Sequence, residues 1–401
     1  MGTQANTELE LISMTGVQTR MNAKEEQVLL DVLRNAPSLS TGEQGAAFER
    51  EWSAFIGCID SVSVCNCSAA LELSAILSGA GPGDEVILPA HTFVSSAVPF
   101  GRTGATLRWA DIESDTFLIS AKSVESMINE KTKVIVVVHL YGMPADMDAI
   151  MSLANQNGIM VVEDCAQAPG AKYKGRRVGS MGHFGCFSFH THKNITTLGE
   201  GGMLTVQDKP HGEAARRLRW MGNWPFEGER QRYWLPAMSN LVEPIAGQWP
   251  HNYCMGEPNC AVGRLLMKRL DAIDNQRRSQ ARRFIGGLAD FPELNFQKVP
   301  PDHEHAYHLM AARYDGGSYG KTRDDLIQLL FEKYKIKCLV HYWPLNRSEL
   351  FRSFGFEQAK VPDTDHFFDN MLGFPWWSNM GDELVDDMAG RTCDALQELR
   401  S

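Results

Sequence analysis

Three residue types that could act together in catalysis stand at the ends of apolar stretches. Lys193 lies in the segment 187–202, among histidines, hydroxyl-bearing residues and glycines. Asp164 ends the apolar run IMVVED, and Ser68 opens a helix-like stretch after SVSVCN. A lysine amine can form a Schiff base with an aldehyde, and a carboxylate can keep a pyridine nitrogen protonated. Because a helix N-terminus offers N–H groups to a phosphate, the three together predict a site for pyridoxal 5'-phosphate.

Two neighbours would complete such a site. Ala69 would add a backbone N–H at the start of the helix, and Phe93, after the strand-like run DEVIL, would cover the cofactor ring. Taken singly, these residues have ordinary structural explanations: a turn cap for Asp164, a helix N-cap for Ser68, a core position for Phe93 and a solvated loop for Lys193. The GEGG turn at 199–202 is a weak phosphate motif, because it lacks the full glycine fingerprint and a Walker lysine. The hypothesis therefore depends on the elements that bring these side chains together.

Apolar strand-like runs alternate with helix-like runs along the first half of the chain. The strand-like runs are 61–66, 84–90, 106–112, 133–142, 159–164, 184–189 and 201–206, and the helix-like runs include 68–81, 120–130 and 146–158. Continuous apolar strands that alternate with helices predict an α/β fold with a mostly parallel sheet buried on both faces. Ligands of such sheets bind at the carboxyl ends of the strands. The acid, the helix start and the lysine all fall at that edge.

The length of 401 residues predicts two domains. We expect a large cofactor-binding domain over residues 1–274, with an N-terminal arm at 1–30, and a smaller α+β domain over 275–401. The spacing of apolar residues at 259–288 predicts one long helix that joins them. The segment 208–251 is rich in Trp, Pro and Gly and predicts an irregular excursion with a functional or interfacial role.

Composition excludes several classes of protein. A net charge of −10 argues against a nucleic-acid binder, and no apolar run approaches the length that a membrane span requires. The nine cysteines do not show the paired spacing of a zinc site, so we expect no metal. Their odd number, with no signal peptide at the start of the chain, favours a reducing cytoplasm.

The stretch VVEDCAQAPGAKYKGRRVGSMGHFGCFSFHTHKNITTLGEGGMLTV (161–206) resembles the signature region of the DegT/StrS family of sugar aminotransferases. Members of this family are fold-type I pyridoxal phosphate enzymes. The resemblance continues upstream in 68–97 and 136–150 and downstream in 251–271 and 305–309, so that it covers residues from about 40 to 380. It implies transfer of an amino group from glutamate or glutamine to a keto sugar, typically a nucleotide-linked one, in amino-sugar, glycan or antibiotic biosynthesis.

The resemblance also implies roles for individual residues. Lys193 holds the cofactor covalently and shuttles protons, and Asp164 pairs with the ring nitrogen. The other residues implied in cofactor binding are Gln167 on the ring hydroxyl, Phe93 over the ring, and Cys67, Ser68, Ala69 and Ser188 at the phosphate. Asn252 reaches the phosphate of the partner subunit, which implies a homodimer with shared active sites. His190, His308 and Tyr342 are implied in substrate binding.

The chain departs from the family pattern at three places. Cys67-Ser68 replaces Gly-Thr, which keeps the hydroxyl but loses the freedom of glycine to take a positive φ. Cys254 replaces an arginine, and Asn346 replaces a histidine. These changes leave a keto sugar on another carrier, or a cyclitol, open as substrates. A related dehydratase branch has histidine at the position of Lys193, and a non-catalytic binding protein with the same fold is a further alternative.

Overall fold

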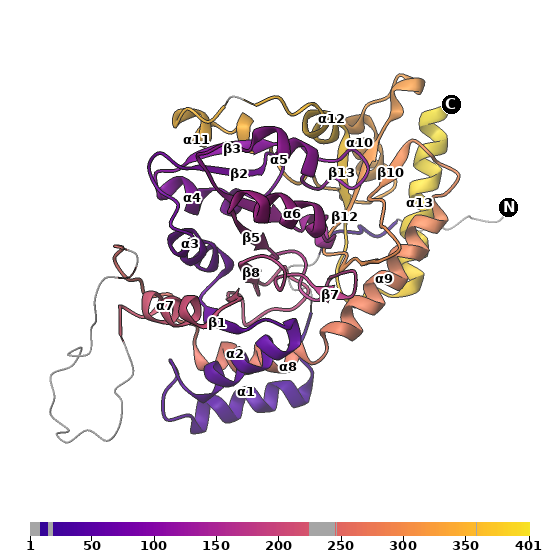
Figure 1. The fold of residues 1–401 in the computed structure, drawn as a ribbon. Helices are drawn as coiled ribbons and strands as arrows, with labels where there is room; N and C mark the ends of the chain where they lie inside the picture. Colours follow the sequence, from indigo (N-terminus) through magenta and orange to yellow (C-terminus); the bar gives the residue numbers. More distant parts are fainter. Residues whose placement is uncertain (1–8, 15–18, 224–244, 246, 358) are drawn as a thin grey trace, which may run out of the picture.

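The computed structural model describes residues 9–14, 19–223, 245, 247–357 and 359–401. Its centre is a seven-stranded sheet in the order β1-β9-β8-β5-β4-β2-β3 (Figure 1). These strands are β1 (Asp60–Val64), β2 (Glu85–Pro89), β3 (Thr106–Ala110), β4 (Thr132–Val138), β5 (Met160–Asp164), β8 (Phe184–Ser188) and β9 (Gly202–Val206). Only β9 runs against the others, because β1 and β8 both pair with it in antiparallel register. The prediction of a mostly parallel sheet is confirmed.

Residues of β4 alternate between two apolar cores. Val134 and Val136 pack in the core on one face of the sheet, and Ile135 and Val137 pack in the core on the other face. The first core includes α3 (Cys67–Leu77), α4 (Val98–Arg102) and α7 (Lys209–Arg219). The second includes α2 (Glu43–Ile56), α5 (Ala121–Met127), α6 (Met147–Asn157) and α8 (Glu257–Met267). All four β4 side chains are fully buried, and each burial contributes about 1.5–3 kcal/mol.

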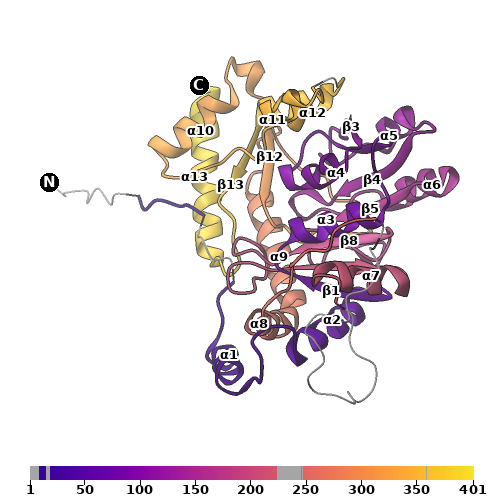
Figure 2. The ribbon, with the colours of Figure 1, turned by 90° about the vertical axis from the view of Figure 1, so that its left-hand side faces the viewer.

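The C-terminal part of the chain builds a smaller α+β unit beside the sheet (Figure 2). Its own sheet has the order β10 (Leu294–Phe296), β12 (Met310–Tyr314), β13 (Met371–Phe374). Its core is covered by α9 (Leu270–Gly287), α10 (Arg323–Glu332) and α13 (Asp382–Arg400). The intervening α11 (Glu349–Ser353) and α12 (Pro362–Asn370) place Phe351 and Phe367 in the two cores of the central sheet. The remaining short strands, β6 (Lys172–Tyr173), β7 (Arg176–Arg177) and β11 (His303–Glu304), form a third sheet that joins the two parts.

The boundary that we place after residue 274 falls inside α9. Leu270 and Ile273 pack in the second core of the central sheet, the one that includes α2, α5, α6 and α8. Ala281 and Phe284 pack in the core of the C-terminal unit. The helix therefore belongs to both parts, and the division into domains stays a prediction.

Two expectations about helices are wrong. The run 259–288 is not one helix, because α8 ends at Met267 and α9 begins at Leu270. Arg269, at the break, pairs with Glu25 of α1 (Ala23–Asn35) at 2.8 Å, a contact between distant parts of the chain that local periodicity does not reveal. The irregular excursion also begins later than expected, since 209–219 form α7, whose first turn is capped by the Asp208 side chain. Residues 224–244 and 246 of that excursion lie outside the described residues.

The N-terminal arm lies along the C-terminal unit and reaches the sheet edge. Ile12 exchanges backbone hydrogen bonds with the chain on either side of Ile336. The Thr19 hydroxyl donates to the Asn194 carbonyl at 2.6 Å, and α1 begins within the predicted arm. Within the described ranges, the helices are too short or too polar to cross a lipid bilayer.

A buried carboxylate holds the turn between β7 and β8 against the sheet. Glu163 precedes Asp164 in β5, and its side chain is fully buried. It accepts hydrogen bonds from the backbone N–H groups of Gly179 (2.7 Å), Met181 (2.8 Å) and Gly182 (2.6 Å). The His139 ring adds a fourth at 3.0 Å. These four donors occupy both carboxylate oxygens and fix the turn that leads into β8.

We predict that Glu163→Ala lowers the free energy of unfolding by about 3–5 kcal/mol, because it leaves buried donors without an acceptor. Urea unfolding of the apoprotein at fixed protein concentration measures this change. The matched control is Glu130→Ala, an exposed position where we expect a change below about 0.5 kcal/mol. A loss of less than about 1 kcal/mol for Glu163→Ala would contradict the role given to this network.

Candidate active site

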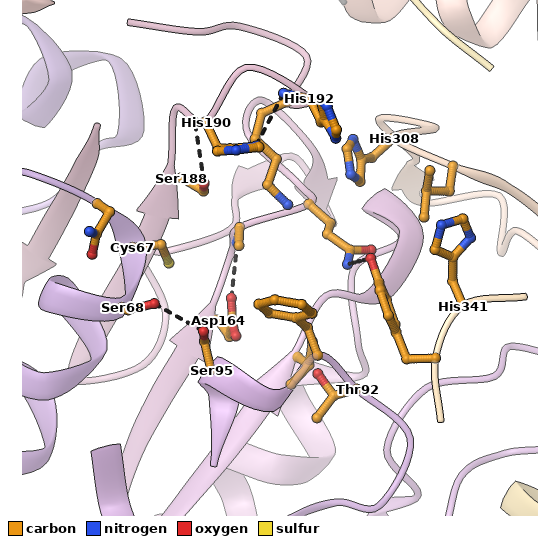
Figure 3. A pocket seen from close by; sticks show the side chains of 18 of the residues that line it. Cys67, Ser68, Thr92, Ser95, Asp164, Ser188, His190, His192, His308 and His341 are labelled. Atoms are coloured by element: carbon orange, nitrogen blue, oxygen red, sulfur yellow. Dashed lines mark hydrogen bonds between the residues drawn. The ribbon is translucent and has the colours of Figure 1, made fainter. Parts of the chain in front are cut away.

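A cavity of about 510 Å³ opens at the carboxyl ends of β1, β4, β5 and β8 (Figure 3). Its volume lies in the range of small-molecule sites. Ten of the twelve predicted site residues line it: Cys67, Ser68, Phe93, Asp164, Gln167, Ser188, His190, Lys193, His308 and Tyr342. Ala69 and Asn252 are not among its lining residues. The sheet therefore brings together side chains that are far apart in the sequence.

Lys193 lies on the connection between β8 and β9. Its backbone N–H donates to the His190 carbonyl at 2.9 Å, which makes a tight turn and directs the side chain into the cavity. Burial lowers the pKa of the Lys193 amine, while the nearby Cys67, Asp164 and Glu200 oppose that shift. A lowered pKa increases the fraction of neutral amine, the form that acts as a nucleophile or base.

Asp164 is the last residue of β5 and is 5% exposed. One carboxylate oxygen accepts from the Ser96 hydroxyl at 2.7 Å and the other from the Ala166 N–H at 3.1 Å. The Ser96 hydroxyl is in turn 2.9 Å from that of Thr92. Burial raises the pKa of Asp164, and the Ser96 and Ala166 hydrogen bonds oppose this. Our sequence interpretation missed Ser96 and Thr92, although both belong to the hydroxyl-rich run that follows β2.

At the predicted phosphate-binding end of the site, the residue that caps the N-terminus of α3 differs from the one we expect. The N-cap of α3 is Asn66, not Ser68, and its side chain accepts the Ala69 N–H at 2.9 Å. The Ala69 N–H thus already has an acceptor, and its role at a phosphate stays a prediction. Cys67 is the first helical residue and has no positive φ, so the loss of glycine there causes no backbone strain.

Other donors remain at that end. The first N–H groups of α3, on Cys67 and Ser68, have no acceptor within the helix, as at any helix N-terminus. The Ser68 hydroxyl donates to that of Ser95 at 2.9 Å, and the Ser188 hydroxyl accepts from the His190 N–H at 3.3 Å. Amides and hydroxyls at a helix N-terminus suit a phosphate dianion.

Gly202 allows this helix N-terminus to approach the sheet. A Cβ at that position would lie 2.5 Å from the Asn66 carbonyl carbon and 2.8 Å from the Cys67 nitrogen. Both atoms belong to the backbone and cannot move without moving the start of α3. A glycine in β9 is thus a steric requirement of the phosphate end.

We predict that Gly202→Ala weakens binding of pyridoxal phosphate by about tenfold or more, because the added methyl displaces the α3 N-terminus. Titration of the apoprotein, followed by visible absorbance, measures the affinity. Gly81→Ala is a suitable control, because a Cβ there meets nothing within 4 Å and φ is not positive. Unchanged affinity in Gly202→Ala would place the phosphate elsewhere.

Gln167 and the aromatic rings of Phe93 and Tyr342 form another part of the cavity wall. The Gln167 carbonyl oxygen accepts the Tyr141 N–H at 2.7 Å, and its amide nitrogen donates to the Tyr342 hydroxyl at 3.1 Å. The orientation of the amide is therefore fixed, with its NH₂ group directed toward the cavity side. Phe93 is 50% exposed, which rules out a core position, and its ring lies 5.6 Å from that of Tyr342.

Four histidines line the cavity: His190, His192, His308 and His341. Burial lowers the pKa of His341 to about 4 and that of His308 well below its usual value, with the Lys193 charge adding to both shifts. These two imidazoles are therefore neutral at pH 7. The sequence interpretation missed His192 and His341. His192 directly precedes Lys193 in the sequence, and His341 directly precedes Tyr342. This adjacency to predicted site residues is the signal that could have identified them.

Asn252 and two positions where the chain departs from the family pattern, Cys254 and Asn346, are not among the residues that line the cavity. Asn252 is exposed and forms a backbone bridge with Trp220. Cys254 lines a smaller cavity with Arg216 and Arg219, both of which pair with Glu49. Asn346 has no contact with the main cavity. The shared active site that the resemblance implies stays a prediction.

The residues present fit the expected cofactor. The described wall of one cavity carries a lysine amine, a buried carboxylate held by hydrogen bonds, an amide of fixed orientation and a helix N-terminus flanked by hydroxyls. An aldehyde, a pyridine nitrogen, a ring hydroxyl and a phosphate would each meet a complementary group.

Comparison with known proteins gives the same result. A model of the DegT/DnrJ/EryC1/StrS aminotransferase family matches residues 19–392. The spore coat polysaccharide biosynthesis protein SpsC of Bacillus subtilis is 35% identical over 361 residues, which cover 90% of this chain and 91% of SpsC. The dTDP-3-amino-3,4,6-trideoxy-alpha-D-glucose transaminase of Streptomyces venezuelae is 31% identical over 400 residues, which cover 99% and 98% of the two chains.

Solved structures agree with the fold. The pyridoxal phosphate form of the putative sugar aminotransferase Spr1654 from Streptococcus pneumoniae superposes with a TM-score of 0.84 at 26% identity. The alignment covers 97% of this chain and 100% of that one.

Proposed function

The chain belongs to the DegT/DnrJ/EryC1/StrS aminotransferase family and is a pyridoxal phosphate-dependent aminotransferase, and from this premise we propose that it transfers an amino group from glutamate to the ketone of a nucleotide-linked sugar. The observation that carries the proposal is the placement of Lys193 and the buried Asp164 in one cavity. Glutamine is the alternative donor. The proposed site of the reaction is the cytoplasm.

We assign the cofactor-binding roles as follows. Lys193 holds the cofactor covalently, Asp164 faces the ring nitrogen, and Gln167 meets the ring hydroxyl. Ser68, Ser188 and the first N–H groups of α3 hold the phosphate, and Phe93 covers the ring. When bound, pyridoxal phosphate supplies an aldehyde for the amine and a ring that withdraws electrons from the reacting carbon.

The protein side chains move the protons. With the cofactor bound, the neutral Lys193 amine would take the proton from the carbon that carries the amino group of the donor, and it would deliver that proton to the cofactor carbon that receives the amino group. Asp164, which carries a negative charge against a protonated ring nitrogen, holds that nitrogen in its cationic form. Glutamate leaves as 2-oxoglutarate, and the keto sugar leaves as an amino sugar, so the two half-reactions balance.

The nature of the acceptor rests on relatives and on side chains. Two relatives are named as a dTDP-amino sugar transaminase and as a polysaccharide biosynthesis protein, which supports a keto sugar. The neutral imidazoles of His308 and His341 and the hydroxyl of Tyr342 can exchange hydrogen bonds with sugar hydroxyls. A panel of ketones tests the acceptor: nucleoside diphosphate keto sugars, the same sugars without the nucleotide, and a keto cyclitol, each assayed for the amine by mass spectrometry. Amination of only the carrier-free ketones would overturn the nucleotide-linked assignment.

We predict that borohydride treatment of the holoenzyme attaches the reduced cofactor to the peptide that contains Lys193. Lys193→Ala removes this label and lowers the rate of 2-oxoglutarate formation on the order of 1,000-fold or more, because nucleophile and base are both lost. Lys209→Ala, an exposed lysine, is the control and should leave both unchanged. Cofactor binding and labelling without conversion of glutamate would favour a non-catalytic binding protein instead.

We also propose a homodimer in which Asn252 reaches the cofactor phosphate of the partner. Its exposure outside the cavity of its own chain supports this role. We predict that Lys193→Ala and Asn252→Ala chains, each of low activity, regain about a quarter of the wild-type activity after they are unfolded and refolded together, because half of the chains form mixed dimers with one intact site in two. Sedimentation checks that dimers form. No recovery in mixed dimers would show that Asn252 serves its own chain.

A further inference from the structure

We infer that Asp274 and Asn194 are positioning residues that hold His308 in one tautomer, with its Nε2 presented to the cavity as a hydrogen-bond acceptor. Asn194 directly follows Lys193, and Asp274 lies on α9, 80 residues further along the chain. Neither residue lines the cavity, so any effect on the reaction must pass through a residue that does. The kinetic part of this inference rests on the proposed function, whereas the assignment of the tautomer does not.

The orientation of the Asn194 amide is fixed by two acceptors. Its NH₂ group donates to the Asp274 carboxylate at 3.1 Å and to the Ala306 carbonyl at 3.0 Å. The Ala306 carbonyl can only accept, whether or not Asp274 is ionised, and an ionised Asp274 adds a second acceptor on the same side. The opposite orientation would place the amide oxygen against the carbonyl oxygen. The oxygen of Asn194 must therefore face away from the carbonyl.

This oxygen faces His308. The Nδ1 atom of the imidazole lies 3.3 Å from the Asn194 Oδ1. Because an amide oxygen only accepts, Nδ1 must carry the hydrogen. Burial lowers the pKa of His308 well below its usual value, so the ring is neutral and Nε2 has no hydrogen. Among the described residues, Nε2 has no hydrogen-bond partner, and His308 lies at the cavity wall (Figure 3).

Helix α9 anchors the backbone on which His308 stands. Arg277, one turn after Asp274, donates from Nε to the Tyr307 carbonyl at 2.8 Å and from a terminal nitrogen to the His308 carbonyl at 2.9 Å. The two α9 side chains thus fix different parts of the segment that precedes β12: Arg277 fixes the backbone of Tyr307 and His308, and Asp274, through Asn194, fixes the His308 imidazole.

Burial of the Asp274 carboxylate costs free energy that a role in packing alone would not require. It is 1% exposed, and its second carboxylate oxygen has no hydrogen-bond partner among the described residues. Burial raises its pKa to about 7. An apolar side chain of similar size would avoid this cost. The carboxylate adds an acceptor for Asn194 and a negative charge near the buried Arg277 guanidinium, and only the first of these acts on the imidazole of His308.

The tautomer matters because the two ring nitrogens would do different chemistry toward a ligand. An Nε2 lone pair accepts from a sugar hydroxyl or from an amine hydrogen beside Lys193, whereas an Nε2–H would donate to them instead. In the tautomer assigned here the group at position 308 is an acceptor, so a substrate hydroxyl has to donate to it.

The first test reads the tautomer directly in the apoprotein. Chains with ¹⁵N-labelled histidine are examined by two-bond ¹H–¹⁵N correlation, and the His308 signal is assigned by its absence in His308→Gln. We expect a protonated Nδ1 and a bare Nε2 in the wild-type chain, and a mixture in Asn194→Ala. Asp274→Asn, which keeps an acceptor, should retain the wild-type pattern, whereas Asp274→Leu should not. A wild-type ring protonated on Nε2 would overturn the inference, whether or not the protein turns over substrate.

The second test asks which nitrogen the substrate meets. An asparagine at position 308 places its amide near Nδ1, whereas a glutamine places its amide near Nε2 and can still accept there. We expect His308→Gln to keep kcat/KM for the keto sugar within about tenfold of wild type and His308→Asn to lose about 100-fold. Equal losses, or a smaller loss in His308→Asn, would contradict an acceptor role for Nε2. Circular dichroism and thermal unfolding show whether each variant folds, and the wild-type spectrum decides the tautomer if one does not.

Discussion

The cost of removing charged groups from water is the constraint on which this site depends. Lys193, Asp164, Glu163 and Asp274 all lie in or beside the sheet edge, where burial opposes their charged forms. A group of this kind is stable only where hydrogen bonds or opposite charges compensate it. The fold supplies backbone N–H groups to Glu163 and Asp164, with a hydroxyl on Asp164, whereas nearby acidic groups oppose the loss of charge on Lys193. The pKa values of the reactive Lys193 and Asp164 remain shifted.

The two adjacent acids of β5, Glu163 and Asp164, have different roles: the first is structural and the second faces the cavity. Successive side chains of a strand point to opposite faces of the sheet. Glu163 faces the turn at 179–182 and is saturated with four donors, while Asp164 faces the cavity and has one hydroxyl and one backbone N–H. Glu163 therefore holds the turn in place, whereas the Asp164 carboxylate can accept a further hydrogen bond from a ligand. A one-residue shift in register would exchange these roles.

Sequence patterns could predict the sheet and the reactive pair because both depend on local properties. Apolar runs bounded by turn residues define β4 and β5, and a lysine among histidines and glycines marks the connection after β8. The cap of α3 could not be settled this way, because Asn66 and Ser68 are both good caps and only the exact start of the helix decides between them. Ser96 and His341 depend on contacts between segments far apart in the chain, and no local pattern encodes such contacts.

In the proposed reaction the cavity accepts two different partners in turn, a charged amino donor and a polyhydroxylated ketone. A wall built from fixed charges would suit one and leave unpaired charge with the other. Among the described lining residues, Lys193 is the only lysine or arginine and Asp164 and Glu200 are the only carboxylates, and the rest of the wall includes the neutral imidazoles of His308 and His341, hydroxyls and an amide. Such groups form hydrogen bonds with either partner. Their donors and acceptors must then be fixed in direction, because a freely turning amide or ring would match both partners poorly. The hydrogen bonds of Gln167 to Tyr141 and of His308 to Asn194 provide that direction from outside the cavity, so selectivity in this site originates one layer behind the surface that the substrates touch.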